Sequence, residues 1–511
     1  MKNIFIALLA LSVSSSAALA SGVSPRFVLM KSSDLPITTF NITFRVGSAD
    51  DPKGDEGLAN LTARMLREGG VAAATIAGMK LPARTRAELE DFLFPLSADI
   101  GVSAEKEQVS LSVTSTGADA ETVFGVLAQL ILAPAFAPAE LDRLKAEELD
   151  ALSKQLPRED QEELGKAALD QVIYGPSHPY AHVVQGTVKG VGGVTIDKVR
   201  EFYRSMFTRR RLTVGIAGVV SPRLLARAKA AFGKLPEGTS DRAEIPAAPA
   251  KEGVRLTIVK GPFDAVGAHL GQPIPLNRAS PEFGDLYLAS WAFGKHRSFV
   301  GRLMSHVREI RGLNYGTYSY AEDFPAGGHH LSEPTQAART RQAFTVWARP
   351  TTMPNGCFLL RQIYRETNLL ATEGLTKAEF DLTKSHLVGN APLLATGLER
   401  RLGYAVDSVF YGLKGDYLAR LQKGAQAATH ARVNAVIKKY LHPDRMDMVV
   451  VTPDPDKYRE QVLGAKCEIS YASGVTKAPE VLAEDKVIST YPLGLAPERI
   501  SVISSESVFD K

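Results

Sequence analysis

An internal repeat is the feature that most constrains the fold. Residues 139–145 and 378–384 share the pattern Ala-Glu-x-Asp-x-x-Lys at an offset of 239 positions. Residues 199–211 resemble residues 433–445 at an offset of 234, and each segment has the pattern of a helix that runs into an apolar strand. Each copy must cover an apolar sheet face with helices. We therefore expect an α+β fold of two related halves, each built of antiparallel sheet layers covered by helices.

A stretch rich in Pro, Ala and small polar residues separates the two copies. Residues 236–253, PEGTSDRAEIPAAPAKEG, have the composition of an exposed linker. The expected organisation is a signal peptide over 1–20, an N-terminal half over 21–236, a linker over 237–253, a C-terminal half over 254–470 and a C-terminal extension over 471–511. The extension lacks helical periodicity, and we expect it to wrap the surface of the body; the sequence assigns it no chemical role.

The first twenty residues have the pattern of a secretory signal. A basic start at Lys2 precedes the apolar run 4–13, and Ala-Leu-Ala at 18–20 ends before Ser21. The apolar run is too short to span a bilayer comfortably, and Ser21 stands where a lipoprotein would need Cys. We expect an exported, periplasmic protein with no stable membrane anchor; an uncleaved anchor is the alternative.

Charge and motifs exclude several classes of function. The net charge is +4 with both signs interspersed, so no basic stripe indicates a nucleic-acid partner. Walker loops, dinucleotide fingerprints and Gly-x-Ser-x-Gly elbows are missing. Cys357 and Cys467 lack the spacing of a metal or redox motif, and they are interpreted as two independent buried residues, although an oxidising compartment would allow them to pair.

The local pattern gives an alternating order of elements in the first half. Residues 26–45, broken at Pro36, predict two neighbouring strands. Residues 84–96 predict a helix, 99–115 a strand pair and 120–133 an apolar helix. A long charged helix follows from Pro138, and residues 199–218 predict a helix followed by a buried strand.

Residues 46–70, VGSADDPKGDEGLANLTARMLREGG, predict a strand end, an acidic turn and a helix with one apolar face. This segment resembles the signature of the pitrilysin/insulinase family of zinc metallopeptidases, whose helix carries His-x-x-Glu-His with two zinc ligands and a general base. The matching positions are Asn60, Ala63 and Arg64. Asn binds zinc poorly, Ala takes no proton from water, and Arg stays cationic and repels the metal. The helix is expected to keep its shape without its chemistry.

The family's third zinc ligand, a glutamate, falls in the charged helix after Pro138. An ungapped alignment places it at Ala151, and a shift of one to three residues would restore a carboxylate. The neighbouring candidates are Glu147, Glu148 and Asp150.

Other histidines in the sequence are candidate metal ligands. His178 and His182 are separated by Pro179, which breaks a helix that could align them; the Tyr-Gly-x-x-His-Pro-Tyr stretch around them again resembles the family. His306 begins a His-x-x-Glu without a second His. His329 and His330, with Glu333, lie in a Gly-rich loop where a weak adventitious site is conceivable. We expect no metal in this chain.

The second half retains a different part of the family pattern. Residues 299–310 predict a helix that ends at Gly312, with a strand from about Leu313. Arg308 and Tyr315 have the seven-residue spacing of the family's downstream Arg and Tyr. The resemblance implies that the guanidinium holds a peptide carbonyl and the phenol donates to an oxyanion. Alternatively, Arg308 pairs with Glu309 and Tyr315 packs in the sheet.

Together these features resemble the bacterial two-subunit branch of the family, in which one subunit carries zinc and the other keeps the Arg/Tyr pair. The resemblance implies a non-catalytic, substrate-binding subunit of an exported heterodimeric zinc endopeptidase, inactive alone, with zinc in a homologous partner subunit and peptide as substrate. Two alternatives remain open. One is a structural or assembly subunit that handles no peptide, and the other is a self-sufficient metallopeptidase with an unrecognised site near His178 or His329.

Overall fold

The computed structural model describes residues 23–239, 243–298, 300–322 and 333–510. The expected signal peptide, Phe299 and the histidine pair His329 and His330 lie outside these ranges. No described helix is long and apolar enough to cross a membrane.

The first half is built on a mixed sheet with strand order β1-β7-β2-β6-β5. Its strands are β1 (Arg26–Lys31), β2 (Ile37–Phe44), β5 (Gly101–Ala104), β6 (Val109–Thr116) and β7 (Leu212–Gly218), and β3 (Ala74–Ile76) and β4 (Met79–Leu81) form a separate hairpin. The strand pair expected over 99–115 is the antiparallel pair β5–β6. Strands β1 and β2 both exist, but they are not neighbours, because β7 lies between them and pairs parallel to β1.

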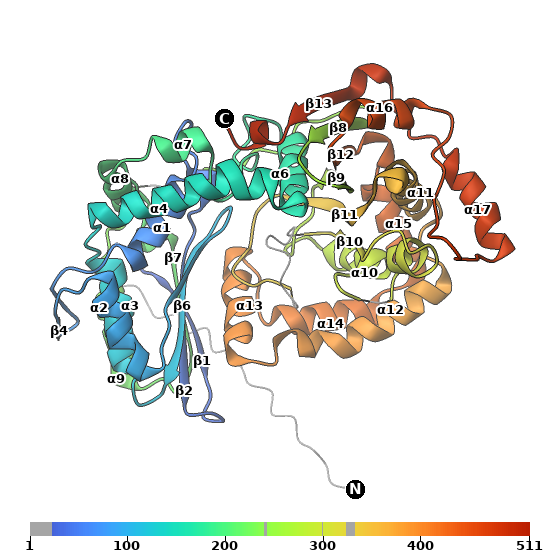
Figure 1. The fold of residues 1–511 in the computed structure, drawn as a ribbon. Coiled ribbons are helices and arrows are strands. Elements are labelled where there is room, and N and C mark those ends of the chain that lie inside the picture. The colour runs from blue at the N-terminus through green and yellow to red at the C-terminus, as the bar shows by residue number, and fades with distance from the viewer. Residues whose placement is uncertain (1–22, 240–242, 299, 323–332, 511) are drawn as a thin grey trace, which may run out of the picture.

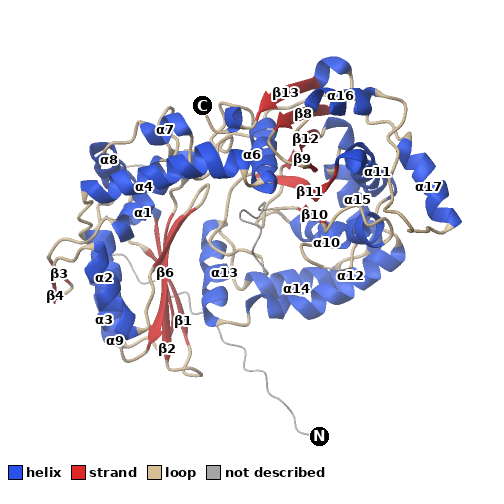
Figure 2. Ribbon diagram, in the orientation of Figure 1, coloured by secondary structure: helices blue, strands red, loops and turns tan. Residues whose placement is uncertain are grey.

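Helices cover one face of this sheet (Figures 1 and 2). The helices of the first half are α1 (Leu58–Glu68), α2 (Arg86–Leu93), α3 (Ala120–Leu132), α4 (Pro138–Asp150), α5 (Leu156–Arg158), α6 (Gln161–Tyr174), α7 (Val188–Gly192), α8 (Ile196–Met206) and α9 (Pro222–Phe232). Of these, α6 packs on the second sheet instead. Phe40 of β2, Phe124 of α3 and Phe232 of α9 pack ring against ring in the core between sheet and helices. A π-helical turn, Ala151–Gln155, joins α4 to α5.

The second half repeats this topology. Its sheet has the order β10-β11-β9-β12-β8-β13, so β8, β12, β9, β11 and β10 correspond one for one to β1, β7, β2, β6 and β5. The strands are β8 (Arg255–Lys260), β9 (Ala265–Ile274), β10 (Thr317–Tyr320), β11 (Gln342–Thr352), β12 (Asp447–Thr452) and β13 (Ile500–Ser504). As in the first half, most pairs are antiparallel and one edge adds parallel pairs, here β8 with β12 and β13. The α+β fold of helix-covered sheets is thus confirmed.

The helices of the second half follow the same order. They are α10 (Phe283–Gly294), α11 (Gly356–Glu373), α12 (Lys377–Asn390), α13 (Leu398–Phe410), α14 (Tyr417–Ala427), α15 (His430–Tyr440), α16 (Pro455–Leu463) and α17 (Pro479–Ser489). Helices α10, α11 and α15 correspond to α1, α3 and α8 in order along the chain, and they contain buried residues of the second core.

Each half places one helix on the open sheet face of the other. Helix α6 packs on β9 and β12, and α13, which follows α12 as α6 follows α4, packs on β7 and β2 (Figure 1). Gly165 permits the first contact, since a Cβ there would lie 2.1 Å from the ring of His269. In the second contact, Leu402 and Val406 bury against Ala217. The exchange removes both open apolar sheet faces from water.

The described residues between the halves are mostly exposed and form no helix or strand, but the segment is anchored at a few points. Ile245 is only 4% exposed and belongs to the core, and Arg341 donates to the carbonyl oxygens of Ile245 and Pro246 at 2.9 and 3.1 Å. Lys251 pairs with Asp447 at 2.7 Å. The segment is therefore a largely exposed connection that is fixed to both halves by these contacts.

Two expectations for the C-terminal region were wrong. The extension contains a helix, α17, and a strand, β13, that adds to the second sheet beside β8. Cys357 and Cys467 are both buried, but they form a disulfide, with their Cα atoms 5.5 Å apart. The tail then returns to the first half, where Val188 N donates to Phe509 O at 2.8 Å.

Candidate functional site

Helix α1 presents the three altered positions of the zinc motif. Asp51 caps its start by accepting hydrogen bonds from Gly57 N and Ala59 N at 2.8 and 2.7 Å, and burial raises the pKa of this carboxyl well above its usual value. Gly57 has φ 108°, and a Cβ there would lie 2.6 Å from Gln185 O. The acidic glycine-rich turn therefore fixes where α1 begins and which face it turns inward.

Asn60 and Arg64, one turn apart on α1, both donate to the same atom of α4. Asn60 Nδ2 lies 2.9 Å from Glu148 Oε1, and Arg64 Nη1 lies 2.8 Å from it. Glu148 is 6% exposed, and Ala63 between the two donors is fully buried. The carboxylate that faces the altered motif is thus Glu148, one of the three neighbouring candidates named from the sequence.

Arg64 is held by further carboxylates around this contact. Its Nη2 lies 2.7 Å from Glu147 Oε2 and its Nε 3.2 Å from Glu68 Oε1, and Arg143 bridges Glu68, Glu140 and Glu147. Burial alone would lower the pKa of Arg64, but the hydrogen bonds to Glu148 and Glu147 outweigh it and raise that pKa. The hydrogen bond from Arg64 lowers the pKa of Glu147. A fixed guanidinium therefore supplies the positive charge that these carboxylates face.

The residues present do not fit a zinc ion. A carboxylate oxygen that accepts from both Asn60 and Arg64 has its lone pairs engaged, and a permanent cation stands beside it. Within the described ranges, no group of three or more His, Cys, Asp or Glu side chains could hold a metal ion.

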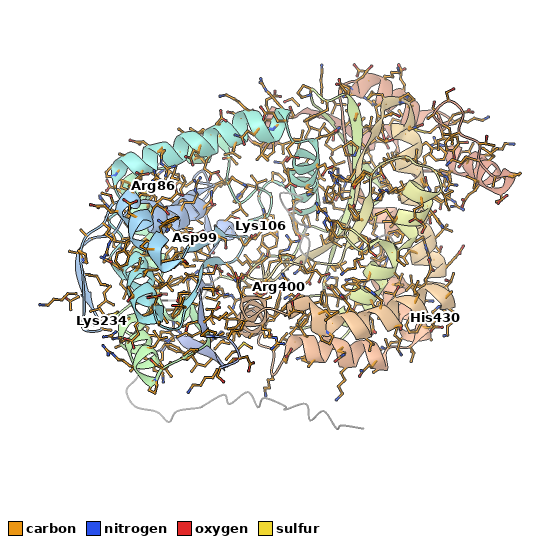
Figure 3. The ribbon with its side chains drawn as sticks, turned by 60° about the horizontal axis from the view of Figure 1, so that its bottom comes forward. Arg86, Asp99, Lys106, Lys234, Arg400 and His430 are labelled. Carbon is orange, nitrogen blue, oxygen red and sulfur yellow. A yellow bond between two sulfur atoms is a disulfide. The ribbon has the colours of Figure 1, made fainter. Side chains whose placement is uncertain are left out.

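The histidines near the resembling Tyr-Gly-x-x-His-Pro-Tyr stretch have structural contacts. His178 Nδ1 accepts from Tyr180 N at 3.0 Å, and its Nε2 lies 3.0 Å from Pro246 O. Burial lowers the pKa of His182 to about 4, and its Nδ1 lies 2.9 Å from Val183 O. Lys106 donates to the carbonyl oxygens of Tyr180 and His182, and in Figure 3 Lys106 lies toward the region where the halves meet.

Arg308 and Tyr315 come together in the second half. Arg308 lies in a π-helical segment, Met304–Glu309, and its Cζ is 4.4 Å from the centroid of the Tyr315 ring. Tyr315 precedes β10, which starts at Thr317 rather than near Leu313. Its side chain is 65% exposed, so the alternative in which Tyr315 packs inside the sheet is wrong. The phenol and the guanidinium are presented together at the surface.

Contacts with two other helices hold the helical segment that carries Arg308. His306 forms an ion pair with the buried Glu366 of α11 at 3.1 Å. The contact with Glu366 is the main cause of the raised pKa of His306. Arg311 reaches α17 in the tail, where it pairs with Asp485 at 2.8 Å and Glu484 at 2.7 Å. The tail is therefore part of the support of this site.

Sequence reasoning missed Arg349, which also lies beside Tyr315. Its Cζ is 5.4 Å from the Tyr315 ring centroid, and its Nε donates to Glu162 of α6 at 2.7 Å. The register between β9 and β11 shifts between Ala348 and Thr351, around Pro350. A proline inside an apolar strand signals such a bulge, and bulges redirect side chains.

The chain is similar to peptidases of one family and to their inactive relatives. A family model described as the peptidase M16 inactive domain matches residues 193–387. The non-peptidase homolog YmxG of Helicobacter pylori is 23% identical over 419 residues, which cover 82% of this chain and 89% of that protein.

Solved structures share the fold over most of its length. The peptidase M16 inactive domain from Pseudomonas fluorescens gives a TM-score of 0.71 at 26% identity, covering 85% of this chain and 97% of that one. The first half of the periplasmic protease PqqL from Escherichia coli gives 0.64 at 13% identity, covering 91% and 94%. With zinc-motif positions occupied by Asn60, Ala63 and Arg64, this chain is similar to the M16 peptidases, the pitrilysin/insulinase family, and in particular to their inactive members.

Proposed function

We propose that this protein is the non-catalytic, substrate-binding subunit of an exported heterodimeric zinc endopeptidase. The contact between the partly buried Arg308 and the exposed Tyr315 is the observation that carries the proposal. A chain with a purely architectural role has no need to present a phenol at 65% exposure under a guanidinium, while the motif on α1 has lost every zinc-binding group.

The chemistry divides between two subunits. A homologous partner with an intact His-x-x-Glu-His supplies the zinc and the general base. Arg308 holds a carbonyl of an extended peptide, and the Tyr315 hydroxyl donates to the oxyanion that forms when water adds to the scissile carbonyl. Neither group can activate water, so this chain alone cleaves nothing.

Export is supported by three observations. The N-terminal sequence has the pattern of a secretory signal. The disulfide between Cys357 and Cys467 suits an oxidising compartment. One protein of the same fold, PqqL, is described as a periplasmic protease.

The test is reconstitution with a zinc-bearing subunit. The mature chain is mixed with an exported homologue that carries His-x-x-Glu-His, and cleavage of a quenched fluorescent peptide is followed. Arg308→Ala or Tyr315→Phe should lower turnover by one to three orders of magnitude, as for loss of an oxyanion donor. Arg420→Ala, on the exposed surface of α14, is the matched control and should leave turnover unchanged.

Two results would contradict the proposal. A stable complex whose turnover is unchanged by Arg308→Ala and by Tyr315→Phe would identify an assembly subunit that handles no peptide. Chelator-sensitive cleavage by the chain alone, with one tightly held metal per molecule, would identify a self-sufficient peptidase.

A further inference from the structure

The Arg308–Tyr315 site carries more positive charge than its family pattern requires. Arg349 lies over the same ring as Arg308, with Cζ–centroid distances of 5.4 and 4.4 Å. The hydroxyl of Tyr318, two residues after Gly316, lies in the electrostatic field of the same arginines. Burial raises the pKa of this hydroxyl, and the positive charges of Arg349, Arg297 and Arg308 oppose that rise. Three guanidiniums therefore act on one small region at the start of β10.

Backbone geometry, and not side-chain freedom, sets the position of Arg349. It lies in the bulge of β11, where Pro350 has no N–H to give to the ladder. Arg349 N donates to Gly316 O at 3.0 Å, and Asn314 Nδ2 donates to Arg349 O at 2.9 Å. The two residues that flank Tyr315 are thus tied to Arg349 on both sides.

One acidic residue reaches this region from the other half of the molecule. Glu162 of α6 accepts a hydrogen bond from Arg349 Nε at 2.7 Å, and its side chain is 18% exposed. Arg349 itself is 33% exposed, and among the described residues its two terminal nitrogens make no hydrogen bond. These nitrogens can form a further charge-assisted hydrogen bond to an incoming group beside Tyr315.

We propose that Arg349 is a specificity-determining residue that makes this site select peptides with a carboxylate next to the segment held by Arg308 and Tyr315. The inference rests on the proposed function, since it assigns a substrate class to the same site. The carboxylate can belong to an Asp or Glu side chain or to the C-terminus of the peptide, because the recognising chemistry is the same.

The test measures binding by the intact mature chain. Three short fluorescein-labelled peptides of one sequence are compared by fluorescence anisotropy: one with an internal Glu and an amidated end, one with Gln and a free C-terminal carboxylate, and one with Gln and an amidated end. We expect one carboxylate peptide to bind about tenfold more tightly than the neutral one, and the arm that does so identifies the source of the carboxylate.

Two substitutions should move this preference in opposite directions. Arg349→Gln should reduce it to about twofold or less, with affinity for the neutral peptide unchanged. Glu162→Gln should increase it several-fold, because the guanidinium loses its competing carboxylate. If Arg349 and Glu162 served only to stabilise the fold, both variants would bind all three peptides more weakly. Arg420→Gln controls for net charge.

Each contradictory result has a distinct meaning. Equal binding of the three peptides by the wild type, or a preference that survives Arg349→Gln, would overturn this inference and leave the proposed function standing. Failure of the wild type to bind any of the peptides, with a verified fold, would overturn both.

Discussion

Arg64 Nη1 and Glu148 Oε1 lie 2.8 Å apart, between helices α1 and α4. In the family that this chain resembles, the corresponding helices hold a zinc ion between imidazoles and a carboxylate. Here Glu148 of α4 faces the altered positions, and the Arg64 guanidinium, one turn from Asn60, supplies its counter-charge. The ion pair explains how α1 and α4 stay packed together without a metal ion between them.

Removing one partner of this pair should destabilise the fold. Arg64→Ala leaves the buried Glu148 carboxylate with Asn60 alone, so we expect a loss of about 2–3 kcal/mol in the free energy of unfolding. Replacing both partners, in Arg64→Met with Glu148→Leu, should cost less than about 1 kcal/mol, because no charge stays buried. Urea unfolding of the single and double variants measures the difference. If the single and the double variant lose the same free energy of unfolding, the cost does not come from an unpaired Glu148 carboxylate.

Restoring the motif should restore metal binding. The variant Asn60→His, Ala63→Glu, Arg64→His places two imidazoles one turn apart, facing the carboxylate of Glu148. We expect about one zinc per chain by elemental analysis after gel filtration, against none for the wild type. Adding Glu148→Gln to this variant should weaken zinc binding by about tenfold or more. A folded triple variant that takes up no zinc, or that ignores Glu148→Gln, would contradict the position of Glu148.

The disulfide should contribute strongly to stability. Cys357 and Cys467 close a loop with a sequence separation of 110 residues. In the loop-entropy account, a loop of this length contributes about 5 kcal/mol. We expect Cys357→Ala with Cys467→Ala to unfold at a lower urea concentration, and reduction of the wild type to have the same effect. Reductant should not affect the double variant, and coincident curves for all samples would refute the prediction.

Stability should depend on the protonation of His306. The Glu366 carboxylate raises the pKa of His306 above its unfolded value of about 6.5. The pair therefore stabilises the fold fully below that unfolded pKa, and this contribution is lost as pH rises through the higher folded pKa. Because the His306 side chain is 36% exposed, solvent screening should keep the effect below about 1 kcal/mol.

The measurement compares the wild type with His306→Gln between pH 5.5 and about 9 by urea unfolding. The stability advantage of the wild type should shrink toward the alkaline end. His442→Gln, which replaces a histidine outside this segment, is the control for titration elsewhere. If the difference in the free energy of unfolding between the wild type and His306→Gln does not change with pH, protonation of His306 does not stabilise the Arg308 segment.

The sequence predicted much of the fold because repetition and periodicity are local properties. The offsets between residues 139–145 and 378–384 anticipated two sheets of matching strand order. They did not anticipate the exchange of α6 and α13 across the halves, which depends on close contacts such as Gly165 with His269. Nor did hydropathy place β7 between β1 and β2, because strand order is set by pairing between distant segments.

The sequence by itself determined that α1 lacks zinc chemistry, since metal binding requires particular side chains and Asn60, Ala63 and Arg64 are not among them. Only the tertiary structure identified Glu148 as the carboxylate facing them, joined Cys357 to Cys467 and brought Arg349 to Tyr315. These contacts join residues that are 34 to 110 positions apart along the chain. The contact with Glu148 also depends on how α1 and α4 are rotated relative to each other. Residue identity limits what chemistry is available, and packing decides which groups meet.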